Sequence, residues 1–131
     1  MPSRADDWLR QADRDMAQSA DSATAERHEW ACFAAQQAAE KAVKALHESL
    51  GQAAWGHVVR RLLEELPQTV RVSDELLDRA RALDAHYVPT RYPNGHAEGH
   101  PGEHYGKRQS AEAMEHARTI VEFCRSQMAQ P

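Results

Sequence analysis

The sequence predicts an all-α protein, an antiparallel up-and-down bundle of four main helices and one shorter helix. Three observations support this fold class. The 131 residues suffice for one domain with a buried core but not for two ordinary domains, so we expect a single domain over 1–131. Hydrophobic residues make up 41% of the chain but aromatic residues only 6%, a mixture that suits helices packed through small side chains. The segment 26–50 contains no glycine or proline and is rich in helix-forming residues.

The segment 26–50 is the central element of the predicted bundle. Apolar or small residues recur in it every three or four positions, which predicts one inward face, whereas Glu40 and Lys44 are expected to reach water. The residues of the inward face are Trp30, Phe33, Ala34, Ala38, Ala42, Leu46 and Leu50. Gly51 is expected to end the helix. At about 1.5 Å per residue such a helix is roughly 37 Å long, so the other helices should pack along it.

Four further helices follow from the same periodicity. They are expected at residues 4–19, 57–66, 73–85 and 110–128. Ser22 to Thr24 offers turn and N-cap chemistry before the long helix. The helix 57–66 places Val58 on its inward face and stops at Pro67, and Ser73 is a suitable N-cap for the next helix. The short connections make neighbouring helices antiparallel.

An irregular loop is expected at residues 87–106. These 20 residues contain three prolines, four glycines, three histidines and three tyrosines, a composition that excludes a helix. Loops of this length in compact domains are uncommon unless they are functional or disordered. The aromatic residues and prolines favour an ordered loop packed on the bundle, whereas the glycines and histidines toward its end favour mobility.

The charge and cysteine content narrow the function classes. The net charge is −4, so the surface as a whole is not that of a basic nucleic-acid protein, and an RNA or nucleotide site must be local. Cys32 and Cys124 form neither a disulfide framework nor a four-ligand zinc pattern, and we expect buried thiols. No apolar run approaches the roughly 20 residues that cross a bilayer, and the start of the chain is too charged for a signal peptide. We expect a cytoplasmic protein with no membrane contact and no cofactor.

Several stretches of the chain carry a family resemblance. They are Asp7-Trp-Leu, the segment 30–46 with its Gln-Gln-Ala-Ala-Glu-Lys run, Gly56-His57, the segment 87–93 with Thr-Arg-Tyr-Pro, and the alanine-rich last helix. Together they resemble the HEPN family (higher eukaryotes and prokaryotes nucleotide-binding domain) over nearly the whole chain. The resemblance implies a helical bundle, a homodimer, and a small nucleotidyltransferase as a partner protein encoded beside it. Many members of that family are metal-independent RNases or toxins that carry an Arg, four to six residues, and then a His.

Arg91 and His96 match this Arg-x4-His spacing. The resemblance implies a catalytic role in which His96 exchanges a proton with a ribose 2′-hydroxyl or the leaving oxygen, and Arg91 holds the scissile phosphate. In HEPN enzymes the motif typically begins a helix and meets its copy across the dimer, whereas Pro93 and Asn94-Gly95 place it in a turn here. The alternative is that Arg91 and Tyr92 fasten the loop to the bundle.

The polar residues beside the alanine-rich seam also have two interpretations. Gln36, Lys41 and Lys44, together with Tyr92 of the loop, are candidates for nucleotide binding, because lysine offers a point charge to a phosphate. Alternatively, Glu40 and Lys44 form an ordinary i,i+4 pair and the glutamines bond across a dimer interface.

For the remaining candidate residues we expect structural roles. His57 is expected to cap or pack, and the three tryptophans are expected to be core or interface anchors. His96, His100 and His104 recur every four residues, which would suit a Zn²⁺ or Ni²⁺ site on a helix. Because glycine and proline interrupt this stretch, we expect solvated loop histidines and no metal site.

The sequence is compatible with two functions. The first is a nucleotide- or RNA-binding HEPN protein in a toxin–antitoxin-like pair with a nucleotidyltransferase, with endoribonuclease action through Arg91 and His96. The second is a non-catalytic dimeric adaptor that binds a nucleotide or a partner protein only.

Overall fold

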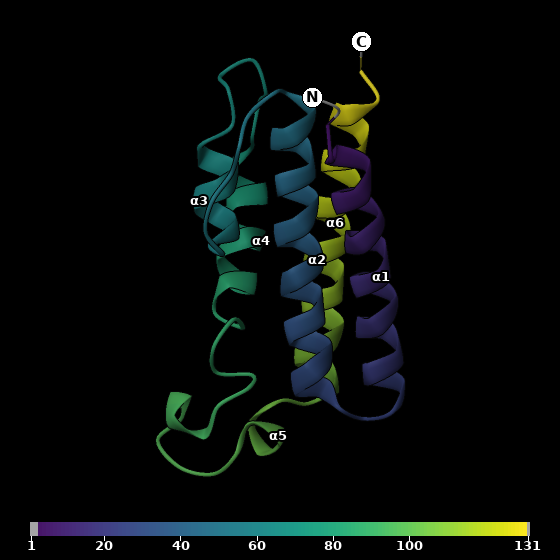
Figure 1. The fold of residues 1–131 in the computed structure, drawn as a ribbon. Coiled ribbons are helices and arrows are strands. Elements are labelled where there is room, and N and C mark those ends of the chain that lie inside the picture. The colour runs from purple at the N-terminus through teal and green to yellow at the C-terminus, as the bar shows by residue number, and fades with distance from the viewer. Residues whose placement is uncertain (1–2, 131) are drawn as a thin grey trace.

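The computed structural model describes residues 3–130, and every regular element in this range is helical (Figure 1). The elements are α1 (Ala5–Thr24), α2 (His28–Ser49), α3 (Val59–Glu64), α4 (Asp74–Asp84), the 3₁₀ turn η1 (Pro93–Gly95), α5 (Pro101–His104) and α6 (Lys107–Met128). The predicted all-α class, with four main helices and a shorter one, is confirmed. None of the helices in residues 3–130 combines the length and apolar character needed to span a bilayer.

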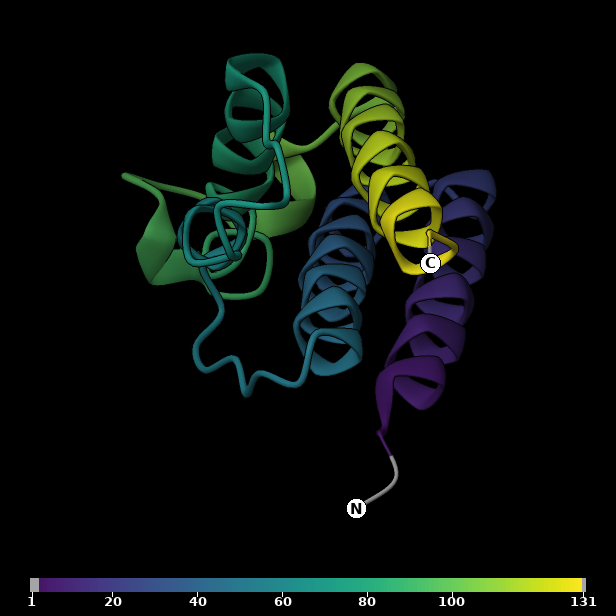
Figure 2. The ribbon, with the colours of Figure 1, turned by 90° about the horizontal axis from the view of Figure 1, so that it is seen from above.

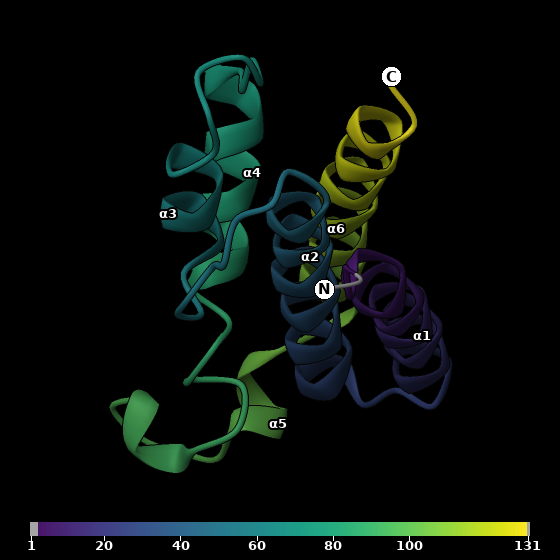
Figure 3. The same ribbon diagram turned by 45° about the horizontal axis from the view of Figure 1, so that its top comes forward.

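α2 is the centre of the bundle. It packs against α1 and α6 on one side and against α3 and α4 on the other (Figure 2). α1 and α4 run in one direction and α2 and α6 in the other (Figure 1). The segment that carries η1 and α5 lies at the end of the bundle where α2 begins and α4 ends (Figures 1 and 3).

The core lies along α2 and is built largely from small side chains. Seven alanines of α2 are buried: Ala31, Ala34, Ala35, Ala38, Ala39, Ala42 and Ala45. These let α1 and α6 approach closely, while larger residues such as Leu62, Leu83 and Ile120 fill the space toward the other helices. Cys32 and Cys124 are buried and free, as predicted. Burial raises the pKa of the Cys32 thiol to about 12, with Glu29 adding to the effect, so this thiol is unreactive.

The predicted helix ends at Gly51 and Ser73 are confirmed. Gly51 has φ +74°, in the left-handed region that glycine adopts without strain, and its N–H donates to Glu48 O at 3.0 Å. The Ser73 hydroxyl accepts a hydrogen bond from Leu76 N at 3.1 Å, which caps α4.

The predicted start of the long helix was wrong. Ser22 to Thr24 forms the last turn of α1 instead of a cap for α2, so α1 is longer than expected. The chain reverses at Ala25–Arg27, where Glu26 has φ +62°, and Arg27 precedes α2 without a side-chain cap. Within α1 the Ser22 hydroxyl accepts a hydrogen bond from Gln18 Nε2 at 2.9 Å.

The predicted inward and outward residues were partly wrong. Glu40 was expected in water but is 4% exposed, because α3 and the segment before it cover its side of α2. Conversely, Trp30, Leu50 and Val58 were expected inside but are 46%, 43% and 37% exposed. These three residues lie at or beyond the ends of helices, where a periodic pattern no longer defines a buried face.

The segment 87–106 is ordered and contains two short helical turns, so its glycines and prolines did not exclude helix. Pro93 and Pro101 each occupy the first turn of η1 and α5, where the missing N–H of proline leaves no unmade helical bond. Thr90 is buried, and its hydroxyl donates to His86 O at 2.6 Å. The loop is therefore packed on the bundle, one of the two predicted alternatives.

Candidate functional site

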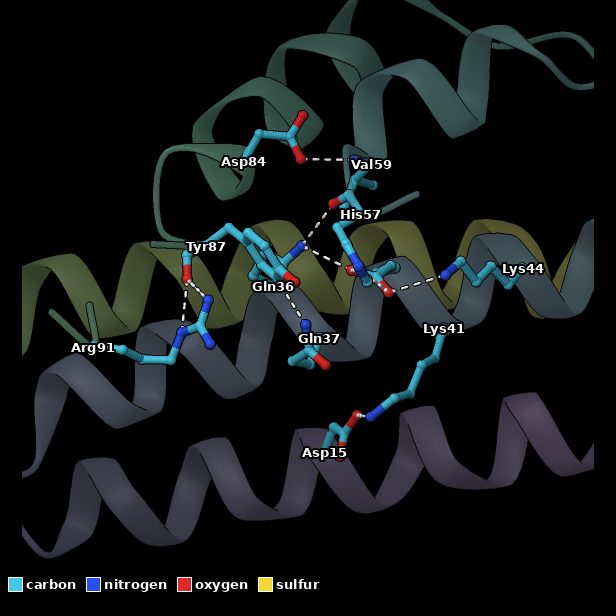
Figure 4. A network of polar contacts seen from close by, with 11 residues as sticks. Asp15, Gln36, Gln37, Lys41, Lys44, His57, Val59, Asp84, Tyr87 and Arg91 are labelled. Atoms are coloured by element: carbon cyan, nitrogen blue, oxygen red, sulfur yellow. Dashed lines mark hydrogen bonds and ion pairs between the residues drawn. The ribbon is translucent and has the colours of Figure 1, made fainter. Parts of the chain in front are cut away.

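Apart from its end turns, α2 is only partly exposed along one stripe, formed by Phe33, Gln37, Lys41 and Lys44. Trp30 extends this stripe toward the start of the helix. We call these five residues the α2 face. Arg91, Tyr87 and His57 border the α2 face on the side of α3 and α4 (Figure 4), and α1 borders it on the other side. Of the sequence candidates, Lys41 and Lys44 belong to the α2 face and Arg91 lies at its edge.

Arg91 is held at the edge of the α2 face by its own turn and by three aromatic rings. Its Nε and Nη2 donate to the backbone oxygen of Tyr87 at 2.9 and 2.6 Å. Its guanidinium carbon lies 4.3 Å from the ring centre of Phe33, 4.8 Å from that of Tyr87 and 5.2 Å from that of Tyr92. Within residues 3–130 its Nη1 makes no hydrogen bond. The guanidinium is thus fixed in orientation but keeps donors for a ligand.

His96 has a different environment from Arg91. Its Nε2 lies 2.6 Å from Pro89 O, and its ring is parallel to that of His104 at 4.1 Å. His104 in turn places Nε2 2.7 Å from Glu98 O. No hydrogen bond or ring contact among residues 3–130 joins Arg91 to His96. Arg91 and His96 are therefore not in direct contact. Their catalytic roles stay a prediction.

A polar network centred on Glu40 lies beside the α2 face. The carboxylate accepts hydrogen bonds from Gln36 Nε2 at 3.3 Å and from Lys44 Nζ at 3.2 Å, and both of its oxygens lie 3.2 Å from His57 Nδ1. Gln36, a predicted nucleotide-binding residue, is fully buried and also donates to His57 O at 3.0 Å. Gln37 donates to Gln36 Oε1 at 2.8 Å. The amide of Gln36 is thus engaged inside the chain instead of facing a ligand.

The sequence did not single out this network. Glu40 was predicted as a solvated partner of Lys44, and His57 as a capping residue. The Glu40–Lys44 spacing and the Gly56-His57 pair were visible, but the contact between Glu40 and His57 joins residues 17 apart, for which no local pattern exists.

The segment that carries His57 is fixed from α4. Asp84 accepts hydrogen bonds from the backbone N–H groups of Val59 at 2.7 Å and Arg60 at 3.1 Å, the first donors of α3. Burial raises the pKa of Asp84, and these two hydrogen bonds act in the opposite direction. The ring of His57 stacks on that of Tyr87, with 4.9 Å between ring centres and 16° between planes.

The two lysines predicted for nucleotide binding are each paired with a carboxylate. Lys41 Nζ lies 2.6 Å from Asp15 Oδ2 on α1, and Lys44 Nζ contacts Glu40 and lies 5.6 Å from the ring centre of Trp8. Both side chains are mostly buried. Arg91 and Arg27, also near this surface, form no ion pair within residues 3–130.

A groove of about 550 Å³ runs between α1 and the α2 face. Trp30, Phe33 and Ala34 supply its apolar lining, and Arg27 and Gln37 lie among its polar residues. Asp15 and Asp21 of α1 also line the groove, so it combines an aromatic wall on α2 with charges of both signs, a lining that suits a flat ligand.

Within residues 3–130 no group of three or more His, Cys, Asp or Glu side chains is placed to hold a metal ion. The segment 87–106 does contain a helical turn, α5, which the glycines and prolines were expected to exclude. Its histidines nevertheless do not converge: His96 and His104 stack on each other, and His100 contacts Glu103.

Comparison with known proteins decides the family. A family model described as HEPN domain matches residues 5–127, which is almost the whole chain. The chain belongs to the HEPN family. The HEPN resemblance predicted from the sequence is thereby confirmed. A search of curated proteins gave no significant match.

Solved structures show how far the HEPN fold is shared. TT1696 from Thermus thermophilus is 43% identical, with a TM-score of 0.95 over 96% of this chain and 99% of that chain. ST0689, an archaeal HEPN homologue, is 35% identical with a TM-score of 0.82, over 97% and 99%. A HEPN domain protein from Thermotoga maritima, TM0613, is 30% identical with a TM-score of 0.77, over 95% and 98%.

Proposed function

We propose that this HEPN protein binds RNA or nucleotides on the α2 face, with Arg91 as the main phosphate contact. The observation that supports this most is the fixed guanidinium of Arg91, framed by three aromatic rings with Nη1 without a partner in residues 3–130. A planar cation with parallel donors suits a phosphate group better than a lysine does.

Exposed aromatic rings beside Arg91 supply contacts for bases. Trp30 is 46% and Tyr92 50% exposed; Trp30 packs edge-on against Phe33, and Tyr92 contacts Arg91. Base stacking on such rings contributes about 1–3 kcal/mol per base and tolerates any sequence. The groove lined by Trp30 and Phe33 has room for one base, and Arg27 lines it together with Asp15 and Asp21. This local site is compatible with the acidic net charge of the whole chain.

A second candidate function is a protein-binding adaptor. Trp55 is 84% exposed, and Leu50 and Val58 near it are also exposed, so the segment between α2 and α3 offers an apolar surface. A homodimer and a nucleotidyltransferase partner, both implied by the family, would use such surfaces. We propose a cytoplasmic site of action, where the free thiols Cys32 and Cys124 stay reduced.

Fluorescence anisotropy with a labelled single-stranded RNA of about ten nucleotides tests the proposed binding. Arg91→Ala should weaken binding by about tenfold, which is about 1.4 kcal/mol, because it removes the phosphate contact. Arg108→Ala is the matched control, since Arg108 is an exposed arginine on α6 whose Nε contacts Glu112. It should bind as tightly as the wild type. Equal affinity of wild type and Arg91→Ala, or no binding by the wild type, would contradict the proposal.

A further inference from the structure

We propose that His57, positioned by Glu40, is the proton-transferring residue of an RNA-cleaving site at the edge of the α2 face. This inference deepens the proposed function and rests on it, because RNA must first occupy that face. It assigns the proton transfer to a residue outside the Arg-x4-His motif.

The contact between His57 and Glu40 joins a buried carboxylate to an exposed imidazole. The Glu40 side chain is 5% exposed and that of His57 is 56% exposed. Both carboxylate oxygens lie 3.2 Å from Nδ1, so Glu40 holds the ring at this nitrogen while much of the side chain stays exposed to solvent.

The contact also determines which nitrogen can act as a base. A carboxylate only accepts hydrogen bonds, so it keeps the proton of the neutral imidazole on Nδ1 and leaves the lone pair on Nε2. Within residues 3–130, Nε2 of His57 makes no hydrogen bond. His57 thus presents an Nε2 without a partner in this range, beside a buried carboxylate that the ring shares with Lys44.

The other histidines in this part of the chain lack one of these features. Both ring nitrogens of His47 are hydrogen-bonded, to Gln52 and to Leu62 O. His96 and His104 use Nε2 on backbone oxygens. His100 contacts Glu103, but that carboxylate is 58% exposed and so interacts weakly with the ring. Only the pair of His57 and Glu40 combines a buried carboxylate with an open Nε2 among residues 3–130.

The position of His57 is fixed from three directions. Gln36 donates both to Glu40 and to the backbone oxygen of His57, so one amide sets the distance between the two residues. Asp84 holds the backbone at Val59 and Arg60. Tyr87 stacks on the ring. Such support reduces the reorganisation that a proton transfer requires.

Tyr87 brings His57 into the same neighbourhood as Arg91. Its ring centre is 4.9 Å from that of His57 and 4.8 Å from the guanidinium carbon of Arg91 (Figure 4). Tyr87 contacts both side chains, so the proposal requires a phosphate held by Arg91 and the adjoining 2′-hydroxyl to reach past the Tyr87 ring to His57. Arg91 would then hold the phosphate while His57 contacts the hydroxyl.

The reaction is transesterification at phosphorus. Nε2 of His57 takes the proton of the ribose 2′-hydroxyl, and the 2′-oxygen forms a bond to phosphorus while the bond from phosphorus to the 5′-oxygen breaks. The departing 5′-oxygen takes a proton from water, and the imidazolium returns its proton to the solvent. The products are a 2′,3′-cyclic phosphate and a 5′-hydroxyl. Arg91 stabilises the charge that develops on the phosphate oxygens.

Single-turnover cleavage of RNA at saturating protein tests this assignment, with the cyclic phosphate end as the product measured. His57→Ala should lower the cleavage rate constant by about 100-fold or more, the range of general acid–base catalysis, with the Kd for RNA changed less than about threefold. Added imidazole should restore part of the rate. Glu40→Gln should lower the rate constant without changing Kd, which separates positioning of His57 from RNA binding. His100→Ala, in which an exposed histidine beside an exposed carboxylate is removed, is the matched control and should cleave as the wild type does.

Each outcome decides between the proposals. Wild-type protein that binds RNA but releases no cyclic phosphate overturns the assignment of His57 and leaves the binding function standing. The same holds if His57→Ala cleaves normally, or if His96→Ala loses cleavage while His57→Ala keeps it. Failure of the wild type to bind RNA overturns the proposed function itself. Thermal unfolding of Glu40→Gln, followed in parallel, confirms that the variant is folded at the assay temperature.

Discussion

Histidine side chains lie in two regions of this HEPN protein and make different contacts there. In the loop 87–106, His96, His100 and His104 bond to nearby backbone oxygens or to an exposed carboxylate. Beside α2, a single histidine contacts a buried carboxylate that also binds Gln36 and Lys44. The loop is richer in histidine, yet its side chains serve mainly to fold the loop on itself. Within residues 3–130, only the histidine beside α2 therefore contacts a buried carboxylate, although the loop holds more histidines.

The largest expected difference between the two regions is in stability. Glu40→Ala leaves the mostly buried Lys44 without its carboxylate and removes one of the two acceptors of Gln36 Nε2, and we expect it to lower the free energy of unfolding by about 3 kcal/mol. Glu103→Ala is the matched control in the loop and should change it by less than about 0.5 kcal/mol, because the pair with His100 is exposed. Urea unfolding measures both. Equal losses in the two variants would remove the distinction between the regions.

A smaller effect is expected for His96. His96→Ala removes the hydrogen bond to Pro89 O and the stacking on His104, and should cost about 1 kcal/mol of stability. Amide hydrogen exchange should accelerate within residues 90–96 but not in α2. Asn94→Ala, an exposed change in the same turn, is the control. Unchanged exchange in the His96 variant would show that these contacts do not hold the loop.

The smallest effect is a pH dependence at the junction of α4 and the loop. Burial lowers the pKa of His86, and the charge of His116 adds to the effect. Because the unfolded chain then binds a proton more readily than the folded one, stability is complete above the ordinary histidine pKa of 6.5 and falls as the pH drops below it. His86→Phe keeps a ring against Tyr105 and removes this proton. The wild type should lose more stability between pH 7 and pH 5 than His86→Phe, as measured by urea unfolding; identical losses would contradict the lowered pKa.

Local signals in the sequence predicted most of the fold. The uninterrupted segment 26–50 indicated the central helix, Gly51 its end and Ser73 the cap of α4, because each depends on residues close in the chain. The family resemblance likewise rests on short stretches of consecutive residues. The turn at Glu26 was missed because Ser22 and Thr24 favour either a cap or a helix end, and only packing selects one.

The candidate site was less accessible to sequence reasoning. Periodicity assigned Glu40 to solvent, since α2 alone does not reveal that the segment carrying His57 covers it. It assigned Trp30 to the core, although the end of α2 leaves that ring exposed beside the groove. The Arg-x4-His motif drew attention to Arg91, but its neighbours Phe33 and Tyr87 come from other elements of the fold. Contacts between elements, not within them, create this surface.

The tautomers of His57 and His96 show whether Glu40 orients the His57 ring. Long-range proton–nitrogen correlation spectra, recorded at a pH where the rings are neutral, report which nitrogen carries the proton. Held by the Glu40 carboxylate, His57 should carry it on Nδ1 with Nε2 bare, whereas His96, which donates to Pro89 O, should carry it on Nε2. A proton on Nε2 of His57 would contradict the account, because the exposed nitrogen could then no longer act as a base.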